Sequence, residues 1–304
     1  MRKISQGLLS AIGNTPIVRI PFKCDGQVFA KLEYLNPGGS IKDRSALFII
    51  EEAERKGLLK PGGTIIESSS GNQGVACAMI GALKGYKVII TASPAMSDEK
   101  VKTIKAYGAD VIHCPAVPIH HKESRHSKAV ELLKNTPNSF MPNQYFNLSN
   151  PKAHYLTLGP EIWKQTKGKI THFFAAAGTG GTISGAGKYL KEKNKNIKVI
   201  AVDVDTSFHS TKGNPKPYKM EGIGIDFETH CLDESAVDEF IPVSDEQGLG
   251  ILPIMAAKYG FLLGTGSGAV SYAVQKYLNK LGKDDVAVML FGDSGRAYLS
   301  KNYY

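Results

Sequence analysis

The sequence predicts an α/β fold in which twisted, parallel-rich sheets are covered by helices on both faces. Short runs of apolar and β-branched residues alternate with segments of helical periodicity over most of the 304-residue chain. This alternation is typical of parallel strands that are joined by crossover helices. Apolar residues make up 42% of the chain, which is enough for a substantial core. The sequence contains no internal repeat and no low-complexity linker, so we expect two domains to exchange segments across a cleft.

Seven strands are predicted from short β-branched runs, and five helices from apolar residues that recur every three or four positions. The predicted strands span residues 28–32, 64–67, 87–92, 110–113, 171–175, 198–202 and 286–291. The predicted helices span residues 74–83, 98–107, 127–134, 185–193 and 247–258. A further helix is expected to begin near residue 42, because apolar residues recur at helical spacing from 46 to 53. Since ligands bind beyond the carboxyl ends of parallel strands, the loops that follow these strands are candidate binding sites.

Lys42 lies in the stretch NPGGSIKDRSA, residues 36–46, between a glycine-proline turn and the expected start of a helix. Ser40 is the expected N-cap of this helix, and Asp43 suits its first turn. A lysine at a helix start usually does no more than solvate, and its charge opposes the positive end of the helix dipole. Burial at this position would lower the pKa of the amine and make it a Schiff-base nucleophile. The local sequence leaves both interpretations open.

A polar loop, ESSSGNQG at residues 67–74, follows one predicted strand and precedes an apolar helix. A simple N-cap needs only one hydrogen-bonding side chain, whereas this loop carries five neutral ones. They are Ser68, Ser69, Ser70, Asn72 and Gln73. Such a cluster at the start of a helix is suited to bind a carboxylate.

A glycine-rich loop, AAAGTGGTISGAG at residues 175–187, follows another predicted strand. Glycines let backbone amides approach an anion, and the start of the following helix favours a phosphate. The spacing does not match a dinucleotide fingerprint, because Ile183 stands where the third glycine is required. It does not match a Walker A loop either, because Ala186 stands where lysine is required. The alternative is a tight strand-to-helix turn without a ligand.

These three features together favour a phosphorylated aldehyde cofactor and an amino-acid substrate. Pyridoxal phosphate meets the requirement, since its aldehyde forms a Schiff base with a lysine and its ring accepts electrons. A nucleotide-binding oxidoreductase is disfavoured, because both glycine fingerprints fail.

Charge, hydropathy and cysteine spacing exclude several other classes. The net charge of +9 includes one dense basic run, KEKNKNIK at residues 191–198, which is typical of a solvated helix end and not of a nucleic-acid site. No signal peptide and no run of about 18 apolar residues is present, so we expect a cytoplasmic protein without a membrane partner. The four cysteines are scattered without a Cys-x-x-Cys pair. The histidine-rich stretch IHHKESRH at residues 119–126 lacks further ligands, so no metal site is expected.

Six motifs occur in the order in which they are found in the cysteine synthase and cystathionine β-synthase family. They are IGNTP at 12–16, KLEYLNPGGSIKDR at 31–44, SSSGNQG at 68–74, GTGGT at 178–182, EGIGIDF at 221–227 and DSGRAYLS at 293–300. The chain therefore resembles these pyridoxal-phosphate enzymes from Ile12 to its C-terminus, and more closely the cystathionine β-synthase catalytic core. The resemblance implies a homodimer of two-domain, fold-type-II chains similar to the tryptophan synthase β-chain. A large cofactor-binding domain would comprise residues 1–38 and 150–304, and a small mobile domain residues 39–149.

The resemblance also implies roles for individual residues. Lys42 would form the internal aldimine with the cofactor and remove the substrate α-proton, and Asn72 would hydrogen-bond the ring hydroxyl. The substrate carboxylate would be bound by Ser69, Ser70 and Gln144. The cofactor phosphate would be held by Gly178, Thr179, Gly180, Gly181 and Thr182. The reaction would be β-elimination to an aminoacrylate followed by addition of a nucleophile, with Lys42 acting first as base and then as acid.

Two positions depart from the family pattern. Gln73 stands where the family usually has threonine, so the substrate-binding pocket around the α-carboxylate or the second substrate is expected to differ. Gly266 stands where the family usually has the serine that faces the pyridine nitrogen. We expect Ser294 to bind the cofactor in place of that serine, with Thr265 and Ser267 as alternatives.

Two carboxylates also lie within the matched motifs. Asp226, in a glycine-rich turn, is either a turn residue that caps its neighbours or a catalytic group that orients a second amino acid's amine or activates water. A hydroxyl group that faces the pyridine nitrogen of the cofactor would leave that nitrogen largely unprotonated. A contact from the Asp293 carboxylate would not leave it unprotonated.

We therefore expect β-replacement on a serine-type or cysteine-type amino acid in sulfur amino-acid metabolism. The sequence leaves the nucleophile open among sulfide, homocysteine, water and another amino acid, and sulfide is the product if cysteine is the donor. One alternative is a cysteine lyase that releases hydrogen sulfide, and another is a synthase that joins an activated serine to an amine. A different class would be a catalytically quiet regulatory protein that retains the fold.

Overall fold

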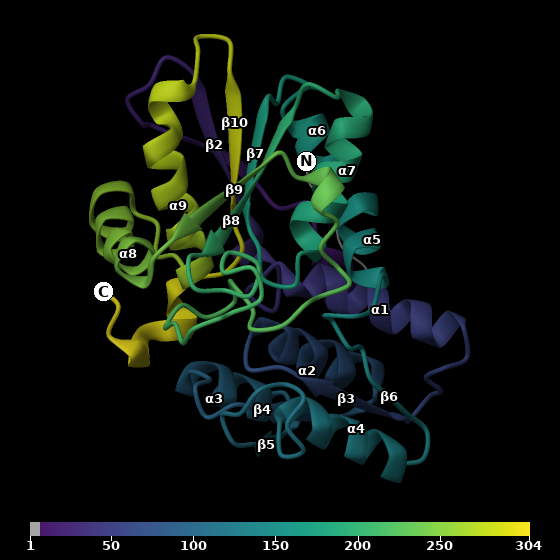
Figure 1. Ribbon diagram of the computed structural model, residues 1–304. Coiled ribbons are helices and arrows are strands. Elements are labelled where there is room, and N and C mark those ends of the chain that lie inside the picture. The colour runs from purple at the N-terminus through teal and green to yellow at the C-terminus, as the bar shows by residue number, and fades with distance from the viewer. Residues whose placement is uncertain (1–6) are drawn as a thin grey trace.

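The computed structural model describes residues 7–304 and contains two sheets, which confirms the predicted α/β class. The first sheet contains, in spatial order, β1 (Ile17–Ile20), β2 (Gln27–Leu32), β10 (Val286–Phe291), β7 (His172–Ala176), β8 (Lys198–Val204) and β9 (Glu239–Val243). The second contains β5 (Asp110–His113), β4 (Lys87–Ala92), β3 (Thr64–Ser68) and β6 (Ser139–Phe140). Neighbouring strands are parallel except for the antiparallel pair β1 and β2. We call the part built on the first sheet the large domain and the part built on the second the small domain (Figure 1).

Helices cover both faces of the large-domain sheet. They are α5 (Ser149–Leu156), α6 (Leu158–Gln165), α7 (Gly181–Lys193), α8 (Asp245–Tyr259) and α9 (Thr265–Tyr277). α8 and α9 lie on one face, and the other three lie on the opposite face (Figure 1). Successive side chains of a strand point to opposite faces, so Phe173 and Phe174 of β7 belong to different apolar cores. Phe173 packs in the core that includes α6 and α7, and Phe174 packs in the core that includes α8 and α9.

The small domain repeats this arrangement on a smaller scale. Its helices are α2 (Asn72–Lys84), α3 (Asp98–Ala106) and α4 (Arg125–Asn135). α2 and α4 both contact β3 and β4, and α4 lies on the face opposite α2 because the chain crosses back over the sheet after β5. A fourth helix, α1 (Lys42–Arg55), joins the domains: its Ala46 and Ile50 belong to the small-domain core, while it also contacts α5.

All the predicted strands and helices are present, but β1, β6, β9, α5, α6 and α9 were not predicted. β6 has only two residues, and β9 is an edge strand that contains Pro242, a residue that argues against a strand. α9 was missed because Gly266 and Gly268 lower the helix propensity of its first turns. A Cβ atom at Gly268 would lie 2.5 Å from the carbonyl oxygen of Gly248, so this glycine permits close packing of α9 against α8.

The start of α1 differs from the prediction. Its cap position is Ile41, and no side chain caps the helix, so the expected N-cap role of Ser40 is wrong. Ser40 Oγ instead accepts a hydrogen bond from the Lys42 N–H at 3.2 Å. The Asp43 carboxylate accepts a hydrogen bond from the Gly38 N–H at 2.5 Å, so it stabilises the preceding glycine turn.

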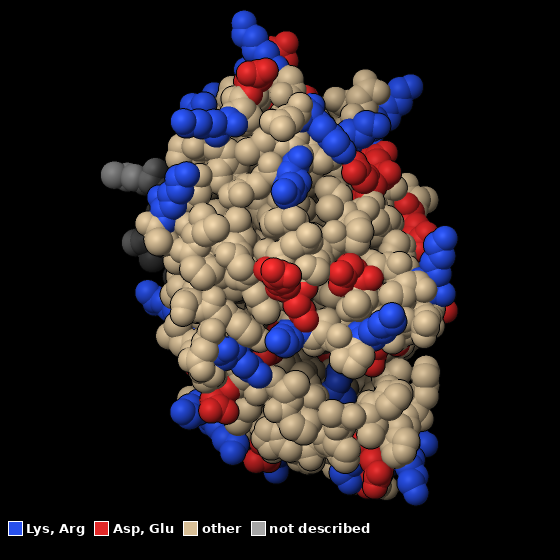
Figure 2. Space-filling view, turned by 60° about the vertical axis from the view of Figure 1, so that its left-hand side comes forward, with Lys and Arg blue, Asp and Glu red and all other residues tan. Residues whose placement is uncertain are grey.

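Charged side chains of both signs share the surface of the molecule (Figure 2). On the face shown in Figure 2, basic and acidic side chains are interspersed. None of the helices between residues 7 and 304 has the length and apolar character needed to cross a membrane. All four cysteines are unpaired, and Cys77, Cys114 and Cys231 are buried. In the described part of the chain, no three His, Cys, Asp or Glu side chains are placed to hold a metal ion.

Candidate active site

A cavity of about 850 Å³ lies between the two domains at the carboxyl ends of β3, β7 and β10. Figure 2 shows a hollow in the surface between the larger upper part and the smaller lower part. A volume of this size is typical of a small-molecule site. Most of the predicted site residues line the cavity, and Gly181 and Ser294 are the exceptions. Those that line it are Lys42, Ser69, Ser70, Asn72, Gln73, Gln144, Gly178, Thr179, Gly180, Thr182 and Asp226.

Lys42 is the first residue of α1, and its side chain lies in the cavity wall. Burial lowers the pKa of its amine, and the nearby Cys231 and Asp293 side chains oppose this shift. A lowered pKa increases the fraction of neutral amine, which is the form that attacks an aldehyde or removes a proton. The local sequence left a solvated lysine possible, and the lowered pKa of a half-buried amine in the cavity wall disfavours that interpretation.

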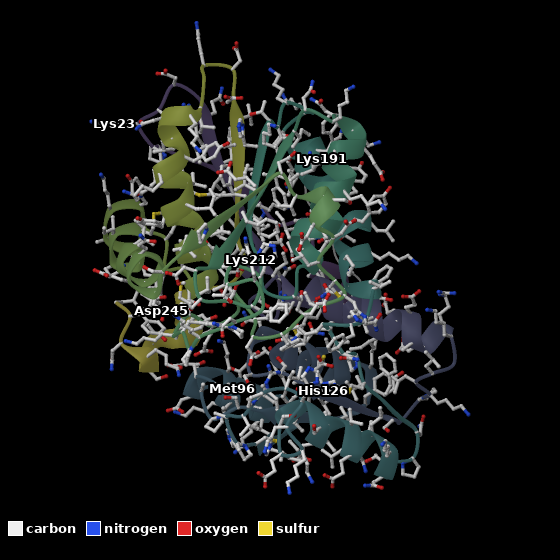
Figure 3. The ribbon with its side chains drawn as sticks, in the orientation of Figure 1. Lys23, Met96, His126, Lys191, Lys212 and Asp245 are labelled. Atoms are coloured by element: carbon white, nitrogen blue, oxygen red, sulfur yellow. The ribbon has the colours of Figure 1, made fainter. Side chains whose placement is uncertain are left out.

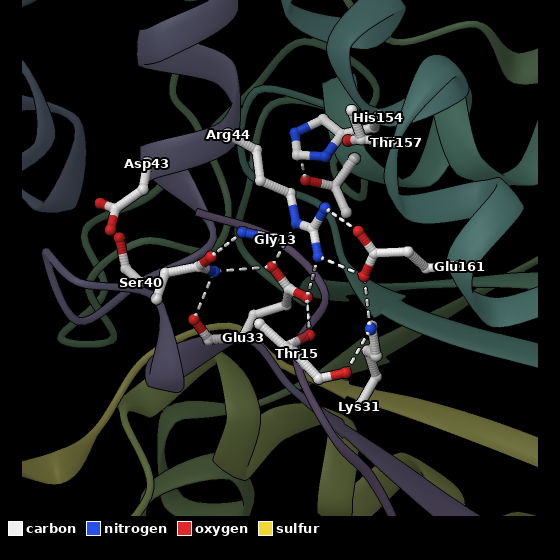
Figure 4. Close-up of polar contacts among 12 residues, drawn as sticks. Gly13, Thr15, Lys31, Glu33, Ser40, Asp43, Arg44, His154, Thr157 and Glu161 are labelled. Carbon is white, nitrogen blue, oxygen red and sulfur yellow. Dashed lines mark hydrogen bonds and ion pairs between the residues drawn. The ribbon is translucent and has the colours of Figure 1, made fainter. Parts of the chain in front are cut away.

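A buried ion-pair network fixes the start of α1 (Figure 4). Arg44 donates to Glu33 at 2.7 and 2.9 Å and to both carboxylate oxygens of Glu161 at 2.8 Å. Lys31 Nζ lies 2.7 Å from the same Glu161. Burial opposes the charged form of Glu33, but Arg44 and Lys31 together hold its pKa below the usual range. Because Arg44 is two residues from Lys42, the network ties the amine to β2 and α6 of the large domain.

The loop after β3 presents polar groups to the cavity. Ser69 Oγ accepts hydrogen bonds from the N–H groups of Gly71 and Gly74 at 3.2 Å each, which shapes the loop. Ser70 Oγ accepts from the Ser93 N–H at 2.7 Å, and its hydroxyl hydrogen remains available to a ligand.

Two buried amide groups of this wall have unpartnered atoms. Gln73 is 1% exposed; its Oε1 accepts from Ser45 Oγ at 3.4 Å, while its Nε2 finds no partner among the described residues. Gln144 is 4% exposed, and its Oε1 likewise has no partner in residues 7–304. An unsatisfied buried polar group costs about 1–3 kcal/mol, so both groups are suited to bind a polar ligand in the cavity.

The loop after β7 has the geometry of an anion-binding site. It leads directly into α7, a helix of 13 residues whose N-terminal N–H groups favour a negative charge. Gly180 has a φ angle of +84°, and a Cβ atom there would lie 2.5 Å from the Cβ of Leu232, so only glycine fits. Gly181 is buried as the first residue of α7 and does not line the cavity.

Side chains behind this loop orient its hydroxyl groups. Asn150 Nδ2 donates to Thr179 Oγ1 at 3.0 Å, and His154 Nε2 lies 3.2 Å from Thr182 Oγ1. His154 is fully buried, and burial together with the charges of Lys42 and Arg44 holds its pKa well below the usual value. The ring is therefore neutral, and it shares a hydrogen bond with Thr182.

The structure argues against the predicted cofactor contact of Ser294. Its Oγ accepts from the Arg296 N–H and donates to the Leu262 carbonyl, both at 3.3 Å, and it caps the 3₁₀ helix η5 (Gly295–Lys301) outside the cavity. Ser267 and Asp293 line the cavity beside Gly266. Ser267 was an alternative in the sequence analysis, and it replaces Ser294 as the candidate hydroxyl.

The cavity wall also contains residues that were not predicted from the sequence, among them an arginine and two tyrosines. Arg125 begins α4, Tyr145 follows Gln144, and Tyr218 lies in the segment that leads to the Asp226 turn. Arg125 was considered only within a histidine-rich stretch, and the signal that identifies it is its position after a predicted strand of the small domain. Burial opposes its charge, but Tyr145 and Asp226 raise the pKa of Arg125 above the usual value.

Comparison with known proteins decides the family. Residues 8–293 match the family model described as pyridoxal-phosphate dependent enzyme. The chain belongs to this family. Its cofactor is pyridoxal phosphate, and the cavity fits it through the Lys42 amine in its wall, whose pKa is lowered, and through the anion-binding loop at the start of α7.

Relatives of this pyridoxal-phosphate enzyme act in sulfur amino-acid metabolism. It is 44% identical to the cystathionine beta-synthase of Apis mellifera over 98% of this chain and 61% of that protein, so the chain spans about three fifths of that relative. It is 39% identical to the cysteine synthase of Staphylococcus aureus (strain Mu50 / ATCC 700699) over 100% of this chain and 98% of that one. The solved structure of the O-acetylserine dependent cystathionine beta-synthase from Helicobacter pylori superposes with a TM-score of 0.92 at 35% identity, and each chain is covered completely. These likenesses support pyridoxal-phosphate-dependent β-replacement.

Proposed function

We propose that this chain catalyses β-replacement on a serine-type or cysteine-type α-amino acid, with Lys42 as the proton-transferring group. The observation that supports this most strongly is the position of the Lys42 amine, whose pKa is lowered, in the wall of a cavity that also contains an anion-binding helix start. When bound, pyridoxal phosphate supplies the aldehyde that binds an amine and the ring that accepts electrons. Lys42 takes the α-proton, the leaving group departs from Cβ with its bonding electrons, a nucleophile bonds to Cβ, and the proton returns to Cα.

The loop after β3 would bind the carboxylate of the donor amino acid. The Ser70 hydroxyl and the Gln73 amide are free to donate, and Ser69 shapes the loop through its two backbone contacts. Gln144 would contribute its side-chain amide from the other side of the cavity. The cofactor phosphate would lie at Gly178–Thr182, where Thr179 and Thr182 are oriented by Asn150 and His154.

The ring of the cofactor would lie near Asn72 and Asp293. Asn72 remains the candidate partner of the ring hydroxyl, although its Nδ2 donates to Asp293 in this structure. Ser267 or Asp293 would face the pyridine nitrogen, because Gly266 supplies no side chain. Asp226 would act on the second substrate at the outer end of the cavity.

We also propose the domain boundaries 1–38 and 150–304 against 39–149. The division of strands supports them, because β3 to β6 form one sheet and the remaining strands the other. Movement of the small domain over the substrate would exclude water from the reacting atoms. We further propose a homodimer, on the basis of the family resemblance, and a cytoplasmic location, which the unpaired cysteines support.

A spectral titration tests the proposed function. The purified protein is titrated with L-serine, O-acetylserine, O-phosphoserine and L-cysteine while the visible absorbance of the cofactor is recorded. Products are then identified by mass after addition of sulfide, homocysteine or no nucleophile. We expect one donor to change the spectrum and to yield a product in which the nucleophile replaces its leaving group.

The matched control is Lys42→Ala, which should bind the cofactor phosphate without the wild-type visible absorbance. A colourless wild-type protein that is unchanged by added pyridoxal phosphate would refute the enzymatic proposal. It would instead favour a catalytically quiet regulatory protein.

A further inference from the structure

A buried carboxylate behind the cavity wall holds a residue of the proposed donor site. Glu67 is the last but one residue of β3 and is only 1% exposed. Its Oε2 accepts a hydrogen bond from the Asn143 N–H at 2.7 Å, and its Oε1 accepts one from the Gln144 N–H at 3.3 Å. Both carboxylate oxygens are therefore bound to the backbone of the segment that places Gln144 in the cavity wall.

The bond to Asn143 stabilises an uncommon backbone conformation. Asn143 has a φ angle of +53°, in the left-handed region that few residues other than glycine and asparagine adopt. Its carbonyl oxygen accepts hydrogen bonds from the N–H groups of Phe146 and Asn147 at 3.0 Å each, so the segment forms a tight turn. Since Gln144 is the next residue, Glu67 fixes the direction in which the chain presents it.

The other side of the Gln144 backbone is held from the large domain. Its carbonyl oxygen accepts a hydrogen bond from Asn150 Nδ2 at 2.8 Å and one from Cys231 Sγ at 3.3 Å. The same Asn150 amide donates to Thr179 Oγ1 in the loop after β7. The Gln144 side-chain Oε1, by contrast, has no partner in the part of the chain that the structure describes. A backbone held on both sides presents such a group to a ligand at a low entropic cost of binding.

The titratable groups around Glu67 come from two helices of the small domain. Arg125 of α4 and the two N–H groups favour the ionised carboxylate, but burial outweighs them and raises the pKa of Glu67 to about 7. Burial and the charge of Glu67 both raise the pKa of Cys77 in α2, so that thiol stays neutral. The neighbouring strand β4 places the apolar Ile90 beside Glu67. Figure 3 labels His126, which follows Arg125, in the small domain.

We propose that Glu67 is a positioning residue for Gln144, and that its carboxylate holds the Gln144 backbone so that the side chain can bind the donor amino acid. This inference rests on the proposed β-replacement, in which Gln144 contributes to the donor site. Glu67 does not line the cavity, so it acts on the donor only through Gln144.

A catalytic role is the other explanation of a carboxyl group whose pKa lies near neutrality. A general base must come within hydrogen-bond distance of the proton that it removes, directly or through one water. Both oxygens of Glu67 already accept backbone N–H groups, and the side chain lies behind the cavity wall. The geometry therefore favours positioning over proton transfer.

The test measures donor binding by spectral titration of the holoenzyme at pH 8, where Glu67 is mostly ionised. The donor is the amino acid that changes the wild-type spectrum. Glu67→Gln keeps the size of the side chain but has one acceptor oxygen instead of two, so the dissociation constant of the donor should rise by roughly tenfold. The value of kcat at saturating donor should change by less than about twofold, because the reacting groups are untouched. Cofactor affinity, measured on the apoprotein, should also stay within about twofold, since Asn150 still holds Thr179.

A double-mutant cycle shows whether Glu67 acts through Gln144. Gln144→Ala should weaken donor binding, and Glu67→Gln should add no further loss in that background. Additive losses would overturn the inference. The control is Glu54→Gln, which removes a small-domain carboxylate that accepts from Lys84 at 2.8 Å and from Tyr86 at 2.7 Å outside the cavity. This variant should bind the donor as the wild type does.

The pH dependence gives a readout that a general loss of folding would not produce. A protonated carboxyl group resembles the glutamine amide, because each has one carbonyl oxygen as its good acceptor. The dissociation constant of Glu67→Gln relative to the wild type should therefore fall from roughly tenfold at pH 8 to about twofold at pH 6. A ratio that stays constant between these pH values would overturn the inference.

The remaining outcomes separate this inference from the function on which it rests. A wild type that responds to no donor would refute both. A wild type that responds, together with a Glu67→Gln variant that binds the donor equally well at pH 8, would overturn the inference alone. Loss of the cofactor spectrum in Glu67→Gln would assign Glu67 to the cofactor and also overturn it. If Glu67→Gln does not fold, Glu67→Asp replaces it, because the shorter side chain cannot reach both N–H groups and should likewise weaken donor binding.

Discussion

The side-chain amide of Asn72 donates a hydrogen bond of 2.7 Å to the carboxylate of Asp293. Asn72 begins α2 of the small domain, and Asp293 lies just beyond β10 of the large domain, so this bond joins the domains at the cavity. The Tyr298 hydroxyl donates to the same carboxylate. Asp293 is only 6% exposed, and burial raises its pKa against the opposing effect of Lys100.

The first prediction concerns this contact. Asp293→Ala should weaken the binding of pyridoxal phosphate by roughly tenfold or more, because it leaves the Asn72 amide and the Tyr298 hydroxyl without their acceptor. Asp293→Asn keeps an acceptor oxygen and should weaken binding much less. The dissociation constant is measured by titrating the apoprotein with the cofactor. Equal affinities for Asp293→Ala and the wild type would show that Asp293 does not position Asn72.

The second prediction concerns the histidine behind the phosphate-binding loop. His154→Phe removes the partner of the Thr182 hydroxyl and should weaken cofactor binding by roughly twofold to tenfold. Since burial and the charges of Lys42 and Arg44 hold the pKa of His154 well below the usual value, the ring stays neutral near pH 7. His154 should therefore add no step near pH 6.5 to the pH dependence of the wild-type cofactor affinity. The wild type and His154→Phe should give pH profiles of the same shape. Such a step would mean that His154 is charged when the cofactor binds.

The third prediction concerns the ion-pair network beneath Lys42. Arg44→Met leaves Glu33 buried without its main partner and should lower the free energy of unfolding by about 3–5 kcal/mol. The control is Arg55→Met on the same helix, where the Arg55–Glu52 contact of 3.3 Å involves an arginine side chain that is 69% exposed. That change should lower the free energy of unfolding by less than about 1 kcal/mol. Urea unfolding of both variants measures the difference, and similar losses would contradict a central role for Arg44.

The alternation of strands and helices was sufficient to predict the α/β class and the three loops that meet at the cavity. Two of those loops follow β3 and β7, the third precedes α1, and parallel strands bring their carboxyl ends to one edge. Lys42 was identified because a lysine at a helix start is unfavourable for the helix itself. The sequence therefore predicted those features that depend on residues close together in the chain.

Contacts between distant segments were not predictable in the same way. Nothing in the sequence near Arg125 shows that it lines the same cavity as Asp226, because this depends on how the two domains pack. The surroundings of Ser294 were hidden for a similar reason: its position in the motif does not reveal that its hydroxyl caps η5. α9 was missed because Gly268 lowers helix propensity but permits close packing against α8, which outweighs that propensity.

The fourth prediction uses Gly266, which lines the cavity without a side chain. A Cβ atom there would lie 3.5 Å from the Cβ of Ala176 and 3.7 Å from that of Ile223, which are ordinary contacts. Gly266→Ser should therefore fold normally and add a hydroxyl that changes the visible spectrum of the bound cofactor. The control is Gly268→Ser, whose Cβ would lie 2.5 Å from the Gly248 oxygen and should lower the melting temperature. If Gly266→Ser and the wild type have the same visible spectrum from about pH 6 to 9, the pyridine nitrogen of the cofactor does not lie beside residue 266.

The last prediction concerns the pH dependence of stability. Asp43 is buried, its Oδ1 has no partner among the described residues, and burial raises its pKa from 3.8 to about 7. Above about pH 4 the unfolded state therefore releases the Asp43 proton, while the folded state still holds it. The contribution of Asp43 to the free energy of unfolding is fully present below about pH 4. It declines as the pH rises to about 7, where the loss amounts to about 4 kcal/mol.

Asp43→Asn should remove this decline, because its amide oxygen still accepts from the Gly38 N–H and it carries no charge. Urea unfolding should give similar stabilities for variant and wild type near pH 4 and a more stable variant near pH 8. Some decline should persist in the variant, since burial also raises the pKa of Glu67 to about 7. Asp98→Asn, an exposed aspartate in the first turn of α3, is the control and should leave the profile unchanged. If the stability of Asp43→Asn and of the wild type changes in parallel with pH, the pKa of Asp43 is not raised in the folded protein.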